Sequence, residues 1–313
     1  MTIAILCSGQ GWQNPDMFAL TGETPETSSL FEHAAKLLGR DPRDFVRNET
    51  SEALHRNRTG QILCTLQALA AAAALRETVP DRIIVAGYSV GEVAAWGVAG
   101  LFGMNDTLDL VARRAEAMDA ASLPGDGLLF IRGLSRDAVD RLCKPYEAAV
   151  AIVNPGDAFV LGGSHSALQA IAKEAKAMNA AKVIDLPVEV ASHTRRLVAA
   201  SAEFRESLRV TSITSTPAAG VRVLSGVDGA PVIRIDSGLD KLAAQISQTV
   251  LWESCLRGCI EAGATSFLEF GPGHALSEMV ASAWRDFPTR CLEDFRSIQG
   301  ARAWLASHGR SLV

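Results

Sequence analysis

Short apolar runs alternate with longer segments of helical spacing along most of this 313-residue chain. A short apolar run that ends in glycine or a polar turn predicts a buried strand, and an apolar stripe of period 3.6 predicts a helix. Strands are predicted at residues 3–7, 82–86 and 266–270, and helices near 28–38, 61–77, 105–121, 238–247, 252–262 and 274–284, with one more ending near 208. This alternation predicts an α/β fold with a parallel sheet at its core.

The middle of the chain has a different order of elements. Strands are predicted at 127–131, 148–153, 158–161 and 181–186, with helices at 135–143 and 164–178. The order βαββαβ is typical of a ferredoxin-like unit. We therefore expect residues 124–187 to form a small inserted subdomain, and residues 1–123 and 188–313 to form a discontinuous large domain. The alternative is that these strands extend the main sheet.

Turn and cap residues predict further boundaries. The pair Asp228-Gly229 is typical of a tight turn, so a hairpin is expected over residues 221–232. Asn105 or Asp106 is expected to cap the helix that ends near residue 121. The helix over 274–284 is expected to be the last regular element.

The composition and charge exclude several classes of partner. Apolar residues make up 48% of the chain, the formal net charge is −5, and basic residues form no tract. Neither a nucleic acid nor a membrane is therefore an expected partner. The apolar stretch 68–75 is too short to span a bilayer, and the first residues resemble a strand rather than a signal peptide.

Six cysteines are scattered along the sequence. They form no C-x-x-C pair, and no group of cysteine and histidine has the spacing of a zinc site. We expect free thiols in a reducing cytoplasm, with no bound metal and no cofactor.

The most informative motif is the sequence GYSVG at residues 87–91. It follows a predicted strand and precedes a predicted helix, so Ser89 is expected on a sharp turn with its hydroxyl exposed at the end of the sheet. The backbone N–H of Val90 would then point toward an oxyanion formed on an attacked carbonyl. The motif predicts a nucleophile for acyl transfer; the alternative is a glycine-rich turn with an incidental serine.

A serine nucleophile needs a base, and two histidines are placed to supply one. His193 and His274 each follow a predicted strand, and active-site groups of open α/β sheets gather at the carboxyl ends of strands. His193 would also lie near a helix N-terminus, whose dipole favours a neutral ring. The residues alone leave both histidines open.

Arg114 shares the apolar stripe of its predicted helix with Leu110, Val111 and Met118. A guanidinium that points inward needs an anion, because a buried unpaired charge is costly. That anion is either an internal carboxylate or a carboxylate on the substrate. Its neighbour Arg113 is expected on the exposed face.

The loop Gly9-Gln10-Gly11 follows the first predicted strand. Glycine lets the backbone approach a ligand, and the amide of Gln10 could donate to an oxyanion. The alternative is an ordinary turn. The loop does not complete the dinucleotide motif G-x-G-x-x-G, because Asn14 stands at the last position.

Several motifs in order resemble one family, the malonyl-CoA:acyl carrier protein transacylases and the acyltransferase domains of fatty-acid and polyketide synthases. Residues 9–13 (GQGWQ) resemble the family's GQGxQ, and residues 87–92 (GYSVGE) resemble its GHSxGE. Residues 186–193 resemble the stretch that leads to the catalytic histidine, and residues 269–273 (EFGPG) resemble a late E-x-GPG turn. Arg114 matches the family's carboxylate-binding arginine.

The resemblance implies a large α/β-hydrolase-like domain with an inserted ferredoxin-like subdomain. It also implies a ping-pong transfer of a malonyl group from malonyl-CoA to an acyl carrier protein, with the CoA thioester as a substrate rather than a cofactor. The resemblance makes Ser89 the nucleophile and His193 its base, and it makes Gln10 and the Val90 N–H the oxyanion donors. The main-chain carbonyl of Gln245 would orient His193. The substrate-binding residues that it implies are Arg114, Gly9, Gln10 and Tyr88. His274 becomes a structural turn residue.

The chain departs from the family pattern at a few positions. Tyr88 replaces the usual histidine before the nucleophile, and Ser8 replaces a common proline before GQG. One alternative is therefore the transacylase that charges the carrier subunit of a malonate decarboxylase. Two others are an esterase or thioesterase that uses His274 as its base, and a carrier-docking subunit without activity.

Overall fold

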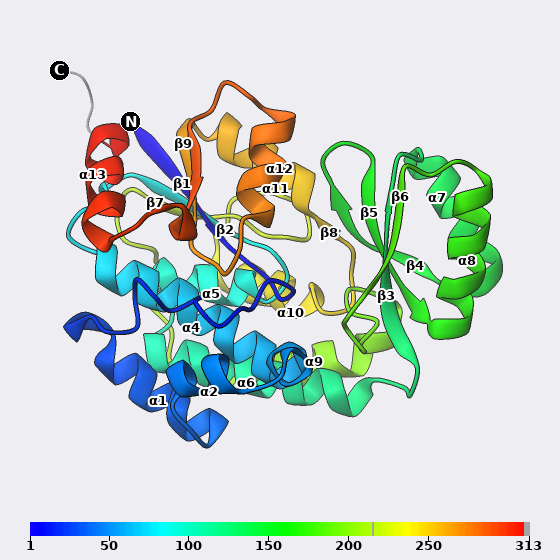
Figure 1. Ribbon diagram of the computed structural model, residues 1–313, viewed down its shortest axis with the longest axis horizontal. Helices are drawn as coiled ribbons and strands as arrows, with labels where there is room; N and C mark the ends of the chain where they lie inside the picture. Colours follow the sequence, from blue (N-terminus) through cyan, green and yellow to red (C-terminus); the bar gives the residue numbers. More distant parts are fainter. Residues whose placement is uncertain (215, 310–313) are drawn as a thin grey trace.

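A five-stranded parallel sheet forms the centre of the larger part of the molecule (Figure 1). The computed structural model describes residues 1–214 and 216–309. The strand order is β10-β9-β1-β2-β7. The strands are β1 (Thr2–Cys7), β2 (Ile83–Gly87), β7 (Val221–Val223), β9 (Ala264–Glu269) and β10 (Thr289–Cys291). The predicted α/β class is confirmed.

Alternate side chains of β1 enter two different hydrophobic cores. Ile3, Ile5 and Cys7 pack in one core, whereas Ala4 and Leu6 pack in the other, as the two-residue repeat of a strand requires. The first core includes side chains from α1 (Ser28–Leu38), α4 (Asn57–Leu75), α5 (Gly91–Val98), α6 (Met104–Ala121), α9 (Val198–Val210), α10 (Ile235–Ala244) and α13 (Ile298–Gly309). The second includes side chains from α11 (Trp252–Glu261) and α12 (Ala275–Ala283).

A second sheet stands apart from the first, with its strands β3 to β6 in green in Figure 1. Its order is β6-β3-β5-β4-β8, and its first four strands pair antiparallel, which is the ferredoxin-like arrangement. The strands are β3 (Asp126–Arg132), β4 (Ala149–Asn154), β5 (Ala158–Ser164), β6 (Lys182–Leu186) and β8 (Val250–Leu251). None of the strands β3 to β6 extends the main sheet.

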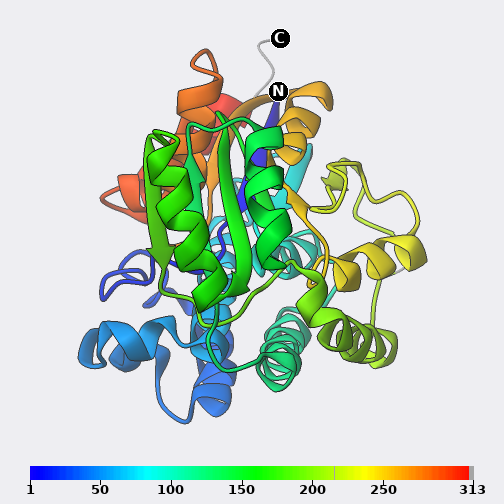
Figure 2. The ribbon, with the colours of Figure 1, turned by 90° about the vertical axis from the view of Figure 1, so that its right-hand side faces the viewer.

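Helices α7 (Arg136–Cys143) and α8 (His165–Ala177) cover one face of the second sheet (Figure 2). Leu129 and Ile131 of β3 pack beneath these helices, whereas Leu128 joins the core that also contains Leu6 of β1. The second sheet therefore packs against the larger part through its other face. Strand β8 crosses the predicted boundary, since it comes from residues 188–313 and pairs with β4. The assignment of residues 124–187 to a separate subdomain stays a proposal.

Several boundaries differ from the sequence predictions. The hairpin predicted over 221–232 is present in a shortened form: around an antiparallel bridge from Leu224 to Pro231, the Ser225 N–H donates to the carbonyl oxygen of Ala230 at 2.9 Å and the Val232 N–H donates to that of Val223 at 2.8 Å. Proline has no N–H to continue a ladder. Strand β7 also pairs with β2. Gly103, rather than Asn105 or Asp106, is the N-cap of α6. Beyond α12 the chain adds β10, a short 3₁₀ turn (Leu292–Asp294) and α13, so 274–284 is not the last element.

Two short helices were not predicted, α2 (Pro42–Asn48) and α3 (Ser51–His55). Asp41 and Thr50 cap their N-termini by accepting hydrogen bonds from backbone N–H groups. Among the described residues, no helix has both the length and the apolar content that crossing a bilayer requires.

Candidate active site

Ser89 lies on a tight turn between β2 and α5, with a φ of 56°. This left-handed conformation is strained for a residue with a Cβ and is typical of a nucleophile elbow. The flanking glycines make the turn possible. A Cβ on Gly87 would lie 2.0 Å from the backbone of Gly91, and a Cβ on Gly91 would lie 2.1 Å from the carbonyl oxygen of Cys7.

Replacing Gly91 with alanine is therefore expected to destabilise the fold by about 3 kcal/mol or more, because backbone atoms must move to admit the methyl group. Urea denaturation would measure the free energy of unfolding. Gly300 is the matched control: it lies in α13, and a Cβ there meets nothing closer than 3.7 Å. Equal stability of the two alanine variants would contradict this account of the turn.

His193 is the histidine that contacts the serine. Its Nε2 lies 2.8 Å from Ser89 Oγ, and its Nδ1 lies 2.6 Å from the main-chain oxygen of Gln245. Because a carbonyl oxygen only accepts, Nδ1 carries the proton and Nε2 is free to accept one from the serine. Burial and the charge of Arg114 lower the pKa of His193 to about 3. The ring is therefore neutral and can act as a base at neutral pH.

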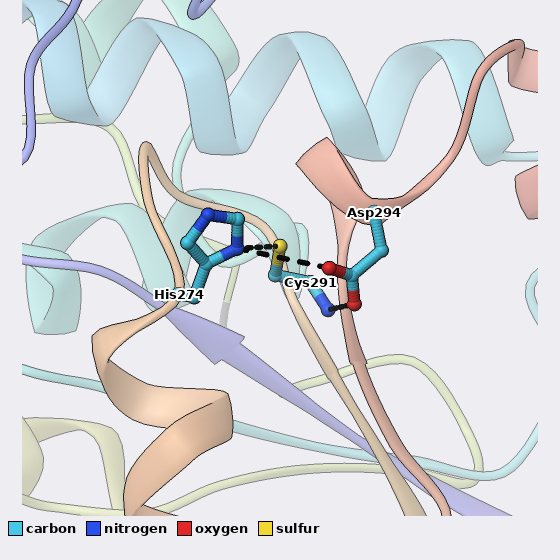
Figure 3. Close-up of side chains that lie close together, drawn as sticks. All are labelled: His274, Cys291 and Asp294. Atoms are coloured by element: carbon cyan, nitrogen blue, oxygen red, sulfur yellow. Dashed lines mark hydrogen bonds and ion pairs between the residues drawn. The ribbon is translucent and has the colours of Figure 1, made fainter.

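His274 lies in a different environment (Figure 3). Its Nδ1 is 2.8 Å from Cys291 Sγ and 3.7 Å from an oxygen of Asp294. The other Asp294 oxygen accepts from the N–H of Cys291 at 3.0 Å, which caps the 3₁₀ turn. The N–S spacing is that of a hydrogen bond, since ligands of a tetrahedral zinc ion lie roughly 3.6 Å apart. Of the two histidines, the structure places His193 at the nucleophile.

Arg114 is 1% exposed and points into the site from α6. Its Nη1 donates to Gln61 Oε1 at 2.6 Å, and its Nη2 donates to Gln245 Oε1 at 3.1 Å. Burial lowers the pKa of Arg114 to about 10, so the guanidinium remains charged at neutral pH. Two neutral amides thus hold it, and within residues 1–214 and 216–309 no carboxylate forms an ion pair with it.

The loop after β1 lies directly against the elbow. A Cβ on Gly9 would be 2.8 Å from the carbonyl oxygen of Tyr88 and 3.6 Å from Ser89 Cβ. One hydrogen of the Gln10 side-chain amide is donated to the carbonyl oxygen of Asn57 at 3.2 Å. Its second hydrogen is a further donor, as is the backbone N–H of Gln10. In the described part of the chain, neither this N–H nor that of the fully buried Val90 donates a hydrogen bond.

Tyr88 packs edge-on against Trp252 of α11, with ring centroids 5.4 Å apart. Burial raises the pKa of the phenol to about 12. The ring thus contributes to the core between the two sheets, and a direct contact of Tyr88 with substrate stays a prediction.

A cleft of about 430 Å³ opens beside the base. Its walls include His193 and Arg195, Ala149 at the start of β4, and Gln248 and Leu251 from the segment that enters β8. The cleft therefore lies where the second sheet meets the larger part, on the side of the site that His193 lines.

Three groups of the site were not predicted from the sequence: the side chains of Gln61, Glu92 and Gln245. All three are buried, with at most 1% of each residue exposed. The sequence signal for such a group is a polar residue on a helix that is expected to be largely buried, as with Gln61 in α4. Such a residue must find a partner, but the sequence does not say which.

Comparison with known proteins agrees with the geometry. The acyl transferase domain family matches residues 6–283. A malonyl CoA-acyl carrier protein transacylase of Mycobacterium tuberculosis is 28% identical over 295 residues, which cover 93% of this chain and 96% of the relative. One of Haemophilus influenzae is 28% identical over 315 residues, with 96% and 98% covered.

Solved structures share the fold over nearly the whole chain. The acyl-carrier-protein S-malonyltransferase of Burkholderia pseudomallei has a TM-score of 0.89 and 26% identity, and covers 97% of this chain and 100% of that one. The corresponding M. tuberculosis structure has a TM-score of 0.88 and 27% identity, with 98% and 100% covered.

Proposed function

The chain belongs to the acyl transferase domain family, and we propose that it transfers a malonyl group from coenzyme A to the phosphopantetheine thiol of an acyl carrier protein. The relatives that it matches over more than nine-tenths of its length carry the names of this activity. The single observation that carries the proposal is a serine-histidine pair beside a buried guanidinium that forms no ion pair with a carboxylate in the described part of the chain. This arrangement suits an acyl group with a negative tail.

In the first half-reaction, Ser89 Oγ attacks the thioester carbon of malonyl-CoA while His193 Nε2 takes the hydroxyl proton. The backbone N–H groups of Val90 and Gln10 stabilise the tetrahedral oxyanion, and the N-terminal position of Val90 on α5 adds the helix dipole. The carbon–sulfur bond then breaks, and the CoA thiolate takes the proton from His193. The product is a malonyl ester on Ser89.

In the second half-reaction, the carrier thiol gives its proton to His193 and attacks the ester carbon. The carbon–oxygen bond breaks, and Ser89 recovers its proton from His193 Nε2. Throughout, Arg114 holds the malonyl carboxylate by charged hydrogen bonds, and the carbonyl oxygen of Gln245 keeps the proton on His193 Nδ1.

Both half-reactions use only the protein, the CoA thioester as acyl donor and the carrier thiol as acceptor, with no separate cofactor. Malonyl-CoA and an acyl carrier protein are the partners. All six cysteines are buried and unpaired, which supports the expectation of a reducing, cytoplasmic setting.

Intact-mass spectrometry after mixing with malonyl-CoA tests the proposal. We expect a malonyl adduct on the wild-type protein, its loss in Ser89→Ala, and its transfer to an added carrier protein. Acetyl-CoA should give far less adduct, because an acetyl group offers no anion to Arg114. An unlabelled wild-type protein, or an adduct that persists in Ser89→Ala, would overturn the proposal.

A further inference from the structure

Glu92 is a fully buried carboxylic acid to which the two half-reactions give no role. It lies in the first turn of α5, one helical turn beyond Ser89. Its Oε2 accepts a hydrogen bond from Gln245 Nε2 at 2.8 Å. Its Oε1 has no hydrogen-bond partner in the described part of the chain. Burying a carboxyl group with one oxygen that accepts no hydrogen bond costs free energy, so a function for Glu92 is expected.

Gln245 connects the groups of the site through a single side-chain amide. Its Oε1 accepts from Arg114, and its Nε2 donates both to the main-chain oxygen of Ser89, at 2.9 Å, and to Glu92. Only one orientation of the amide satisfies all three contacts. The flipped amide would place its NH₂ group against the guanidinium and its oxygen against two acceptors.

The carboxylate of Glu92 is the charged group that favours this orientation. Without it, the amide nitrogen retains only the neutral carbonyl of Ser89, and a flip costs less. The contact of His193 with Gln245 uses the main-chain oxygen instead, so it does not depend on the orientation of the amide.

We propose that Glu92 is a positioning residue that fixes the Gln245 amide and, through it, holds the Arg114 guanidinium in place for the carboxylate of the acyl group. This inference rests on the proposed malonyl transfer and deepens it. It makes preference for a carboxylated acyl group depend on Glu92, while the serine-histidine chemistry does not.

The surroundings of Glu92 support a dependence on pH. The titratable or charged groups that face it are Arg114 from α6, Asp228 from the loop after β7 and Cys255 from α11. Burial raises the pKa of Glu92 to about 7, against the lowering effects of the Gly226 backbone, Gln245 and Arg114. Above this pH the carboxylate accepts firmly from Gln245 Nε2, and below it the neutral acid holds the amide less well.

The first test compares Glu92→Gln with Glu269→Gln. Glu269 is the matched control, because it is equally buried at the end of β9 but contacts Ser8, Leu276 and Ser277 rather than Gln245 or Arg114. The readout is kcat/KM for acylation of Ser89 by malonyl-CoA and by acetyl-CoA. The ratio of the two values cancels effects on folding, on Ser89 and on His193.

We expect Glu92→Gln to reduce the malonyl-to-acetyl ratio about 10- to 100-fold, the loss that removal of a charged hydrogen-bond partner brings. Glu269→Gln should lower both rates together and leave the ratio within about threefold. An unchanged ratio in Glu92→Gln, or an equal fall in Glu269→Gln, would overturn the inference.

The second test needs no variant, so it holds even where Glu92→Gln fails to fold. In the wild-type protein, the malonyl-to-acetyl ratio should fall as the pH drops through about 7. A ratio that stays flat between pH 5.5 and 8.5, about 1.5 units on either side of that pKa, would overturn the inference. A wild-type protein that takes up no malonyl group would instead overturn the proposed function, so the two failures are distinguishable.

Discussion

Replacing His193 with alanine is expected to reduce the rate of malonyl transfer about 10⁴-fold or more, because no other base contacts Ser89 Oγ in the described structure. The hydroxyl then has to lose its proton to water while it attacks. Stopped-flow or rapid-quench measurement of Ser89 acylation gives the rate. Circular dichroism of the variant shows whether the fold survives the loss of a buried ring.

His274→Ala is the matched control for this prediction. It also removes an imidazole at the carboxyl end of a strand, but one that contacts Cys291 and Asp294. Its acylation rate should stay within about threefold of the wild-type rate, since surface-facing changes of this kind cost little. The opposite result, in which His274→Ala is inactive and His193→Ala active, would restore the esterase arrangement.

Replacing Arg114 with alanine is expected to abolish the preference for a carboxylated acyl group. The loss of a buried charged partner should lower kcat/KM for malonyl-CoA about 100- to 1,000-fold, whereas acylation by acetyl-CoA should change little. The two residues that hold the guanidinium, Gln61 and Gln245, are neutral amides. Hence the variant leaves no unpaired buried carboxylate in direct contact with the deleted group.

Arg113→Ala serves as the control, because Arg113 is the exposed neighbour on the same helix. It removes an equal charge from α6 without touching the site. Competition between malonyl-CoA and acetyl-CoA, read by intact mass, measures the preference directly. If Arg114→Ala keeps the wild-type preference, the anion-binding role assigned to this residue is wrong.

The elements nearest the nucleophile could be predicted from sequence because their signals are local. The spacing of GYSVG between a strand and a helix needs no knowledge of distant residues, and the structure places Ser89 on that turn. The inward direction of Arg114 follows equally from its helical spacing to Leu110 and Met118, and this side chain is buried. Both inferences use contacts within about one helical turn.

The partners of these residues could not be predicted from local spacing, because they come from distant parts of the chain. The local pattern placed both His193 and His274 after strands, and the assignment of His193 as the base came from the family resemblance; the contact with Ser89 that bears it out joins residues 104 positions apart. The same holds for the contacts of Arg114 with Gln61 and Gln245, which are 53 and 131 residues distant.

Gln245 serves three neighbours at once, and this sets a limit on protein engineering. Any side chain introduced at position 245 to admit a bulkier or uncharged acyl group also alters the support of the elbow and lies next to the carbonyl that steadies the imidazole. Gln61 contacts the other terminal nitrogen of the guanidinium, and its remaining partners are the side chains of Asn57 and Met118 rather than the elbow. A library of variants intended to accept other acyl groups should therefore vary position 61 and leave position 245 unchanged.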